Sequence, residues 1–281
     1  MNLIEFQIAV IVAIVAANVI IALSNDDNIL KKLNYQNYVS QFRMETESRA
    51  YIDMDWLILH GNVVPQGTKT YITGVRPTAN GTDFCGGSLI TPMHVLTAAH
   101  CIVGDIQYVS VGTHFLSGTE DGEQLKVVNK IPHPKYVSET HSYDLMVLEL
   151  EKPSSYPPIA LAQANDTNGN ATVMGWGATS QNGEQSKELL RVDIPIMNFT
   201  ACGKILEVDD TMLCAGGELD MDSCQGDSGG PLIVEHFDED VLIGVVSWGN
   251  GCGRAGYPGV YARVSVAIDW LQSVAPAITL S

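Results

Sequence analysis

The chain is 281 residues long, 46% of its residues are apolar, and its formal net charge is −17, from 15 Lys and Arg against 32 Asp and Glu. So few cations exclude a general nucleic-acid-binding protein, which needs a basic surface. The high apolar fraction, together with 26 glycines, excludes a disordered chain. Six cysteines are too few for a disulfide-scaffold mini-protein, but their even number fits pairing in an oxidising compartment.

The first residues resemble a targeting segment. An apolar run over 8–23, interrupted only by Asn18, leads into small residues and predicts a signal peptide over residues 1–24 and therefore secretion. The run departs from the usual signal in having Glu5 and no Lys or Arg before it. A membrane anchor is the alternative, because the run is close to the lower length limit for spanning. Sequons that fit a secretory route and predict glycosylation begin at Asn80, Asn165, Asn170 and Asn198.

Residues 25–57 differ in composition from the rest of the chain. They are rich in Asn, Gln and charge and contain no Gly, Pro or Cys, which predicts a pro-segment or mobile arm before a folded domain over 58–281. Residues 1–57 hold four basic and seven acidic residues, which leaves 11 and 25 on the folded domain. The acidity therefore belongs to the folded domain and would attract cationic substrates.

Beyond residue 58, short β-rich runs alternate with Gly, Pro and Asn clusters, which predicts an all-β sandwich or barrel. Only the end of the chain, 264–274, has helical spacing, with Val264, Ile268, Leu271 and Ala275 on one face. The acidic residues 238–240 are expected at a solvated hairpin tip. Strands are predicted over 95–97, 108–111, 145–150, 171–174, 232–234 and 241–246.

Three reactive side chains lie in settings that suit nucleophilic catalysis. His100 follows small residues, Ser228 lies in a Gly-rich loop, and Asp144 opens an apolar strand. A serine hydroxyl needs a base within reach, histidine can be that base near neutral pH, and a carboxylate can fix the tautomer of the histidine. The backbone N–H groups of Gly226 and Ser228 are suited to an oxyanion hole.

These residues belong to a longer ordered set of motifs. The set runs through FCGGSLI (84–90), LTAAHC (96–101), DLMVLEL (144–150), GWG (175–177), DSCQGDSGGPL (222–232), SWG (247–249) and PGVY (258–261). The sequence resembles the trypsin-like serine proteases of the chymotrypsin fold. The resemblance implies two six-stranded antiparallel β-barrels with a C-terminal helix and a cleft between the barrels. It also implies His100 as general base, Asp144 as its orienting acid and Ser228 as the nucleophile of an acyl-enzyme mechanism.

The resemblance further implies the disulfides Cys85–Cys101, Cys202–Cys214 and Cys224–Cys252. No cofactor or metal is expected. The sequence contains no C-x2-C pair of the kind that binds zinc. A calcium loop is doubtful, because Thr113 stands where the first ligand is expected, although Glu120, Asp121 and Glu123 follow it.

The resemblance implies that Asp222 lies at the base of the specificity pocket and that Gly249 and Gly259 form its walls. This arrangement predicts cleavage after Arg or Lys; the alternative is that Asp222 is one more acid of an acidic loop. Ser247 resembles the residue that hydrogen-bonds the triad acid and lines the substrate strand, or is an ordinary strand serine. Trp248 is expected in the substrate groove, and Trp176 and Trp270 in packing.

Activation in this family frees an amino terminus that pairs with the acid before the nucleophile. Here Ile58 would be that terminus and Asp227 its partner. Leu57 precedes Ile58 where a trypsin-like activator would require Arg or Lys, and His60 replaces a glycine. We therefore expect an unusual activator or an uncut, zymogen-like form.

The motifs together predict a secreted serine endopeptidase, monomeric and without stable membrane association. Its expected partners are protein or peptide substrates with Arg or Lys at the cut and protein protease inhibitors. The alternative is a non-catalytic or zymogen-like member that binds or inhibits another secreted protein. The family includes secreted inhibitors of glucanases, which usually lose a triad residue. The remaining histidines are expected at the surface or bonded to a partner (His94), or solvated (His133, His141 and His236).

Overall fold

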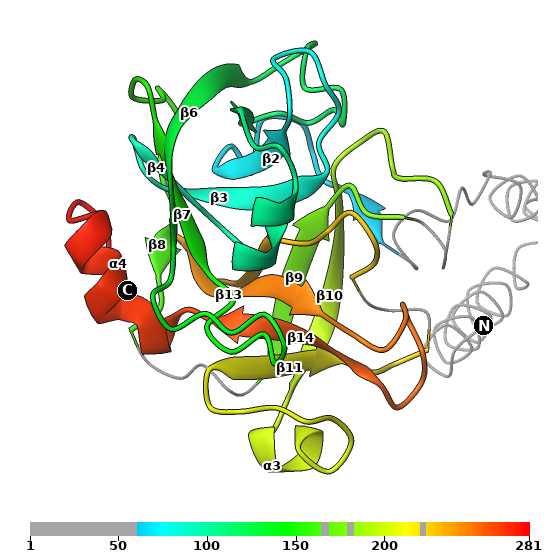
Figure 1. Ribbon diagram of the computed structural model, residues 1–281. Helices are drawn as coiled ribbons and strands as arrows, with labels where there is room; N and C mark the ends of the chain where they lie inside the picture. The colour runs from blue at the N-terminus through cyan, green and yellow to red at the C-terminus, as the bar shows by residue number, and fades with distance from the viewer. Residues whose placement is uncertain (1–60, 164–168, 179–182, 220–222) are drawn as a thin grey trace, which may run out of the picture. The chain divides into compact units, whose positions relative to one another are not determined.

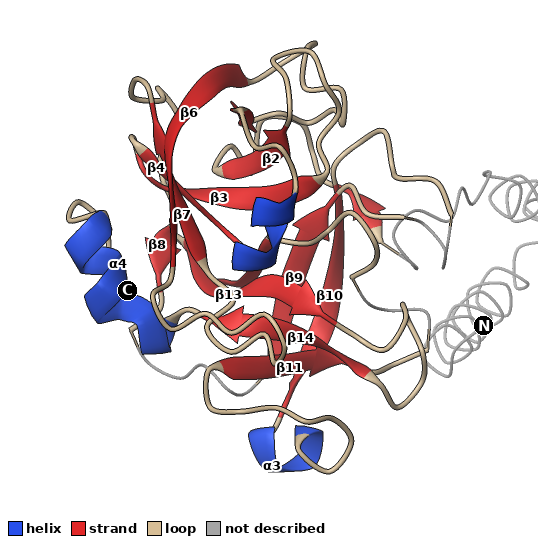
Figure 2. Ribbon diagram, in the orientation of Figure 1, coloured by secondary structure: helices blue, strands red, loops and turns tan. Residues whose placement is uncertain are grey.

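The computed structural model describes residues 61–163, 169–178, 183–219 and 223–281, all within the second of two units, 1–55 and 56–281, into which the chain divides. Strands dominate this part of the chain (Figure 2). In chain order the elements are β1 (Asn62–Val63), β2 (Ile72–Arg76), β3 (Cys85–Thr91), β4 (His94–Thr97), η1 (Ala99–Val103), β5 (Tyr108–Val111), β6 (Glu123–Pro132), β7 (Met146–Leu150), β8 (Ala160–Leu161), β9 (Asn170–Gly175), β10 (Leu190–Met197), α3 (Phe199–Cys202), β11 (Met212–Gly216), β12 (Pro231–Glu235), β13 (Asp240–Trp248), β14 (Pro258–Arg263), η2 (Ser265–Ala267) and α4 (Ile268–Val274).

The first half of the described chain forms a closed antiparallel barrel in the order β2-β3-β4-β7-β6-β5. Every residue of β3 is buried, whereas β6 turns Leu125 and Val127 inward and exposes their neighbours Gln124 and Lys126. This period of two places one face of β6 in the core and the other in water. The barrel core is apolar and includes Ile72, Leu89, Leu96, Val109 and Leu148.

The second half forms a second closed barrel in the order β9-β10-β11-β14-β13-β12, which β12 closes by pairing with β9. Two-residue strands extend it: β1 pairs antiparallel with β10, and β8 pairs parallel with β13. The prediction of two six-stranded antiparallel barrels is confirmed, which decides between sandwich and barrel. The two barrels are the upper and lower parts of Figure 1, and α4 packs beside them.

The C-terminal helix forms where the spacing predicts it, although its first turn is the 3-10 segment η2 and α4 begins at Ile268. The predicted apolar face is the buried one: Val264, Leu271 and Ala275 have no exposed surface. Within the described residues, no helix is both long and apolar enough to cross a membrane.

The two barrels meet through glycines. A Cβ on Gly86 of β3 would lie 2.8 Å from the Cα of Gly230, and one on Gly229 would lie 2.2 Å from Thr97 Oγ1 of β4. Gly86 N also donates to Ser228 O at 2.7 Å. Because there are no side chains at these glycines, the loop that carries Ser228 contacts the strands that lead to His100.

The expected environments of Asp240 and His133 are wrong. Asp238 and Glu239 are exposed between β12 and β13, as expected, but Asp240 begins β13 and accepts from Lys69 Nζ at 2.7 Å and from the Tyr71 hydroxyl at 2.8 Å. His133 is not solvated: it is 6% exposed, stacks on Tyr143 with ring centroids 4.4 Å apart, and packs edge-on against Trp270 at 4.6 Å. Aromatic partners distant in sequence cover this histidine.

Candidate active site

His100 and Asp144 are joined by two hydrogen bonds at the edge of the first barrel. His100 N donates to Asp144 Oδ1 at 2.8 Å, and His100 Nδ1 lies 2.7 Å from Asp144 Oδ2. Ser247, from β13 of the second barrel, donates to the same Oδ2 at 2.5 Å. Because the carboxylate accepts, Nδ1 carries the proton, which leaves Nε2 of His100 to accept one.

Asp144 is completely buried, and its surroundings favour the charged form. Burial by itself would raise the pKa of this carboxyl. The hydrogen bonds from His100 and Ser247, with the charge interaction with His100, hold the pKa below its usual value. An ionised carboxylate in this place can orient the imidazole and stabilise its protonated form.

Ser228 is placed by the junction of the two barrels. Its carbonyl oxygen accepts from Gly86 N and lies 3.8 Å from Sγ of Cys101, the residue that follows His100. The side chain is partly exposed. Among the described residues, no hydrogen bond joins the Ser228 hydroxyl to the His100 ring. The structure therefore joins His100 to Asp144 by hydrogen bonds and places the backbone of Ser228 beside Cys101, the residue that follows His100.

The loop before Ser228 contains Gly226, one of the two residues of the predicted oxyanion hole. Gly226 has φ of +100°, a region that glycine adopts without cost. A Cβ there would lie 2.4 Å from Nε2 of Gln185. Within the described part of the chain, the N–H groups of Gly226 and Ser228 have no protein acceptor, so both can donate to a ligand.

Asp227 is the second completely buried carboxylate of the site. It accepts from Gly177 N and Cys224 N, each at 2.8 Å, and burial raises its pKa to about 6 although both hydrogen bonds lower it. The GWG motif explains how the carboxylate fits: Cβ atoms on Gly175 and Gly177 would lie 2.2 Å and 2.1 Å from its oxygens. No cation contacts it among the described residues.

The recognition residues are only partly described. Ser247 is buried and Trp248 half-buried, and a Cβ on Gly249 would project to 3.9 Å from the Cα of Gly259. The two predicted wall glycines thus face each other. The predicted pocket base Asp222, the predicted terminus Ile58 and the sequon residue Asn165 lie outside the described residues. The other sequon residues, Asn80, Asn170 and Asn198, are exposed.

His141 is a site residue that the sequence reasoning missed. Its ring centroid is 6.1 Å from that of His100 and 6.4 Å from that of Trp248, so it lies beside these two side chains rather than free in solvent. Its position three residues before Asp144 is the one signal in the sequence that could have indicated this.

The six cysteines form Cys85–Cys101, Cys202–Cys214 and Cys224–Cys252, the three implied pairs. Cys85 and Cys101, which with His100 form the candidate metal cluster among the described residues, are therefore not available as thiolates. In the doubtful calcium loop, Asp121 accepts from Thr113 Oγ1 and His114 N, and Ser154 and Ser155 donate to Glu123. These carboxylates have protein partners.

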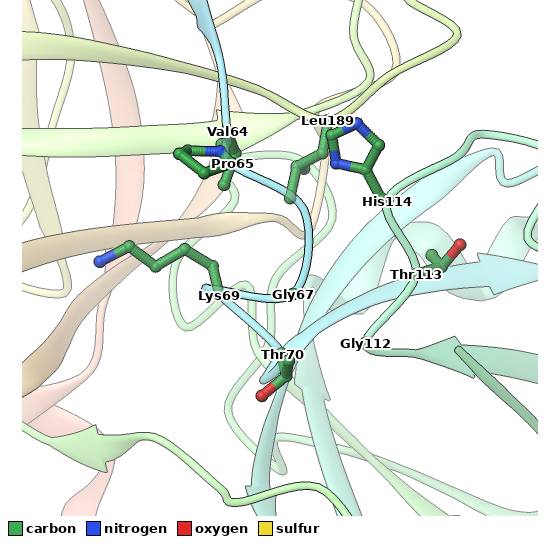
Figure 3. Close-up of a pocket in the computed structure, with 9 residues that line it drawn as sticks. All are labelled: Val64, Pro65, Gly67, Lys69, Thr70, Gly112, Thr113, His114 and Leu189. Carbon is green, nitrogen blue, oxygen red and sulfur yellow. The ribbon is translucent and has the colours of Figure 1, made fainter. Parts of the chain in front are cut away.

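Two hollows lie outside the triad. Figure 3 shows the smaller one, about 10 Å³ in volume, which has room for one water and contains no predicted site residue. It is lined by Val64, Pro65, Gly67, Lys69, Thr70, Gly112, Thr113, His114 and Leu189. An open hollow of about 410 Å³ lies near the segment that precedes Asp144, lined by Thr140, Gly203, Leu206, Glu207, Val208, Asp209 and Met212.

Comparison with known proteins agrees with this geometry. A family model described as Trypsin matches residues 58–271. This chain belongs to the trypsin family. Two trypsin-family relatives from Phytophthora infestans are glucanase inhibitor protein 3, 49% identical over 229 residues, and glucanase inhibitor protein 1, 47% identical over 227 residues; each match covers 78% of this chain and 88% of the relative. A trypsin from Saccharopolyspora erythraea is 43% identical over 206 residues, 69% of this chain and 88% of its own.

Proposed function

We propose that this trypsin-family protein acts outside the cell by binding another protein, and that its partner is a glucanase. The two Phytophthora relatives named glucanase inhibitors, at 49% and 47% identity over 78% of the chain, carry this proposal. One further feature supports a role without proteolysis: Leu57 stands before Ile58, where a trypsin-like activator would need a basic residue.

Inhibition is tested by titrating the full secreted chain into a panel of glucanases and following glucan hydrolysis. We expect saturable inhibition of at least one enzyme, equal for the wild type and for Ser228→Ala, because inhibition by binding needs no nucleophile. Calorimetry gives the dissociation constant directly. Glucanases that keep full activity and show no binding at micromolar concentrations would contradict the proposal.

A serine endopeptidase that cleaves after Arg or Lys is the second candidate, and the closed His100–Asp144–Ser247 network favours it. In that reaction Nε2 of His100 takes the proton of the Ser228 hydroxyl while Oγ of Ser228 attacks the peptide carbonyl. The N–H groups of Gly226 and Ser228 then bind the oxyanion. The leaving amine takes the proton from His100, and a water molecule activated by His100 hydrolyses the acyl-enzyme.

In this candidate, substrate choice rests on Asp222. Its carboxylate would bind a guanidinium or ammonium between Gly249 and Gly259. Hydrolysis of Arg-ended and Phe-ended fluorogenic peptides tests both claims, with Ser228→Ala as control. A preference for the Arg-ended peptide that is lost in the variant supports the candidate. Equal activity of the variant rules out Ser228 catalysis, and a preference for Phe rules out the role of Asp222.

The same processing of the chain is proposed for the glucanase-binding protein and for the endopeptidase. The proposed order is removal of residues 1–24, glycosylation at the sequons and release of the domain at Ile58, whose ammonium would pair with Asp227. Amino-terminal sequencing of the secreted protein tests this order. A mature terminus at Ile58 supports the proposal, and a terminus elsewhere contradicts it. We also propose that the mature protein is a monomer, which light scattering would check.

A further inference from the structure

The segment just before Asp144 has an uncommon backbone. His141 and Tyr143 have φ of 59° and 52°, and they are the non-glycine residues with positive φ in the described part of the chain. Leu145 N donates to Tyr143 O at 2.7 Å, which turns the chain tightly at Asp144. Side-chain-bearing residues seldom adopt this region unless their surroundings hold them there. The position of Asp144 thus depends on what contacts residues 141–143.

One set of contacts comes from the second barrel, in the turn before β11. Asp209 accepts a short hydrogen bond from the hydroxyl of Ser142, and it also accepts from Thr211 N at 2.9 Å and Thr211 Oγ1 at 2.5 Å. Thr211 Oγ1 in turn accepts from Tyr143 N at 3.1 Å. The Asp209 carboxylate therefore holds Ser142 directly and Tyr143 through Thr211.

The other set of contacts lies on the ring of Tyr143. His133, after β6, stacks on this ring, and Trp270 of α4 packs against His133. Lys135 Nζ lies 5.4 Å from the centroid of the Tyr143 ring. The stack supports the ring, but it does not hold the backbone N–H of Tyr143 or the side chain of Ser142. Among the hydrogen bonds to these two groups in the described part of the chain, those from outside residues 137–143 come from the Asp209 turn. Within this stretch, the Ser142 hydroxyl also bonds Thr140 Oγ1 at 2.8 Å, and Val137 N donates to Ser142 O at 3.1 Å.

Asp209 is partly buried and accepts hydrogen bonds from protein groups, unlike a fully solvated surface carboxylate. Partial burial opposes its ionisation, but the hydrogen bonds from Ser142 and Thr211 hold its pKa below the usual value. The next residue, Asp210, is exposed and provides a matched control with the same charge.

We propose that Asp209 is a positioning residue for the active site: through Ser142 and Thr211 it holds segment 141–143 and thereby keeps the Asp144 carboxylate against His100. Asp209 itself touches neither Ser228 nor His100 through any hydrogen bond that the described residues contain. The kinetic consequence rests on the peptidase candidate, whereas the structural consequence holds for either proposed function.

The test compares the full chain with Asp209→Ala, Asp209→Asn and Asp210→Asn. The first readout is hydrogen exchange at the backbone amide of His100, which donates to Asp144. The second is the rate at which a fluorophosphonate probe labels Ser228, with Ser228→Ala as blank. Peptide hydrolysis is the third, and melting temperature reports the fold. The expected kinetic effects are roughly ten- to a hundredfold, the size that small misplacements near reacting groups produce.

We expect Asp209→Ala to speed exchange of the His100 amide about tenfold and to lower the labelling rate and kcat with little change in KM. Asp209→Asn keeps one acceptor and should lie between. Asp210→Asn should match the wild type. Exchange at His100 that is equal in Asp209→Ala and Asp210→Asn would overturn the proposal, even in a protein that hydrolyses no peptide. If the wild type neither reacts with the probe nor hydrolyses peptides, but His100 still exchanges faster in Asp209→Ala than in Asp210→Asn, only the peptidase candidate is overturned.

Discussion

Each barrel contributes one completely buried carboxylate to the site, and the two differ in how they are held. Asp144, at the edge of the first barrel, receives three hydrogen bonds from His100 and Ser247, and its pKa is lowered. Asp227, in the second barrel, receives two backbone hydrogen bonds, and its pKa is raised to about 6. Burial acts in the same direction on both. The number and charge of the donors decide which carboxyl has the lower pKa.

A third buried carboxylate extends this comparison. Asp83 contacts Arg76 through Oδ1, at 2.9 Å from Nε and 2.8 Å from Nη2, while its Oδ2 has no hydrogen-bond partner among the described residues. Burial raises the pKa of this carboxyl to about 7 despite the guanidinium. A cation that contacts one oxygen does not offset burial when the other oxygen has no donor.

The largest expected effect comes from removing the charge of Asp144. Asp144→Asn cannot accept from His100 as the carboxylate does, so the imidazole loses its productive tautomer. We expect labelling of Ser228, and peptide hydrolysis if the chain is a peptidase, to fall about 10⁴-fold, the size known for this exchange in a serine-protease triad. Ser247→Ala removes one donor and should cost less. An Asp144→Asn variant whose Ser228 labelling rate stays within tenfold of the wild-type rate would contradict the role given to the Asp144 charge.

Asp83→Ala should cost about 3–5 kcal/mol of unfolding free energy, because it leaves the guanidinium of Arg76 buried and unpaired. Denaturant titration measures the loss. The matched control is the double variant Arg76→Met/Asp83→Leu, which removes both charges and should be more stable than Asp83→Ala. Equal stability of the two variants would mean that the pair is not electrostatically coupled.

For Asp227, the raised pKa predicts a pH dependence of stability in the uncut chain. The folded state holds this proton more tightly than the unfolded state, so the contribution of Asp227 to stability falls as pH rises from about 4 to about 6. Relative to Asp227→Asn, the wild type should lose about 2 kcal/mol between pH 4 and pH 7. A difference that does not vary with pH would show that Asp227 has a cationic partner.

The smallest effect is expected at His133, beside the Asp144 segment. Burial, with the nearby charge of Lys135, lowers its pKa to about 4, so its contribution to stability is lost as pH falls from about 6.5 towards 4. We expect a loss of about 1–2 kcal/mol, allowing for solvent screening, that is absent in His133→Phe. His236→Phe, on the exposed hairpin, is the control. Thermal unfolding at several pH values measures the difference.

Many of the strands and the C-terminal helix follow from local sequence. The apolar runs became β4, β5, β7, β9, β12 and β13, and the helix formed on its predicted face, because period-two and period-3.6 patterns report burial directly. The hydrogen bond from Ser247 to Asp144, across 103 residues, was expected only because the motif set resembles a family in which such a serine has that partner.

The residue patterns alone determined the all-β class and indicated which residue types carry the chemistry, since these depend on periodicity and on short motifs. The two barrels and the cysteine pairs were expected only from the resemblance to the trypsin-like family. The tertiary structure decided what surrounds them. The packing of Trp270 against His133, the position of the His141 ring beside the His100 ring and the hydrogen bond from Ser142 to Asp209 all join residues from separate segments. No local pattern encodes such contacts, because they arise only when the chain folds and brings distant segments side by side.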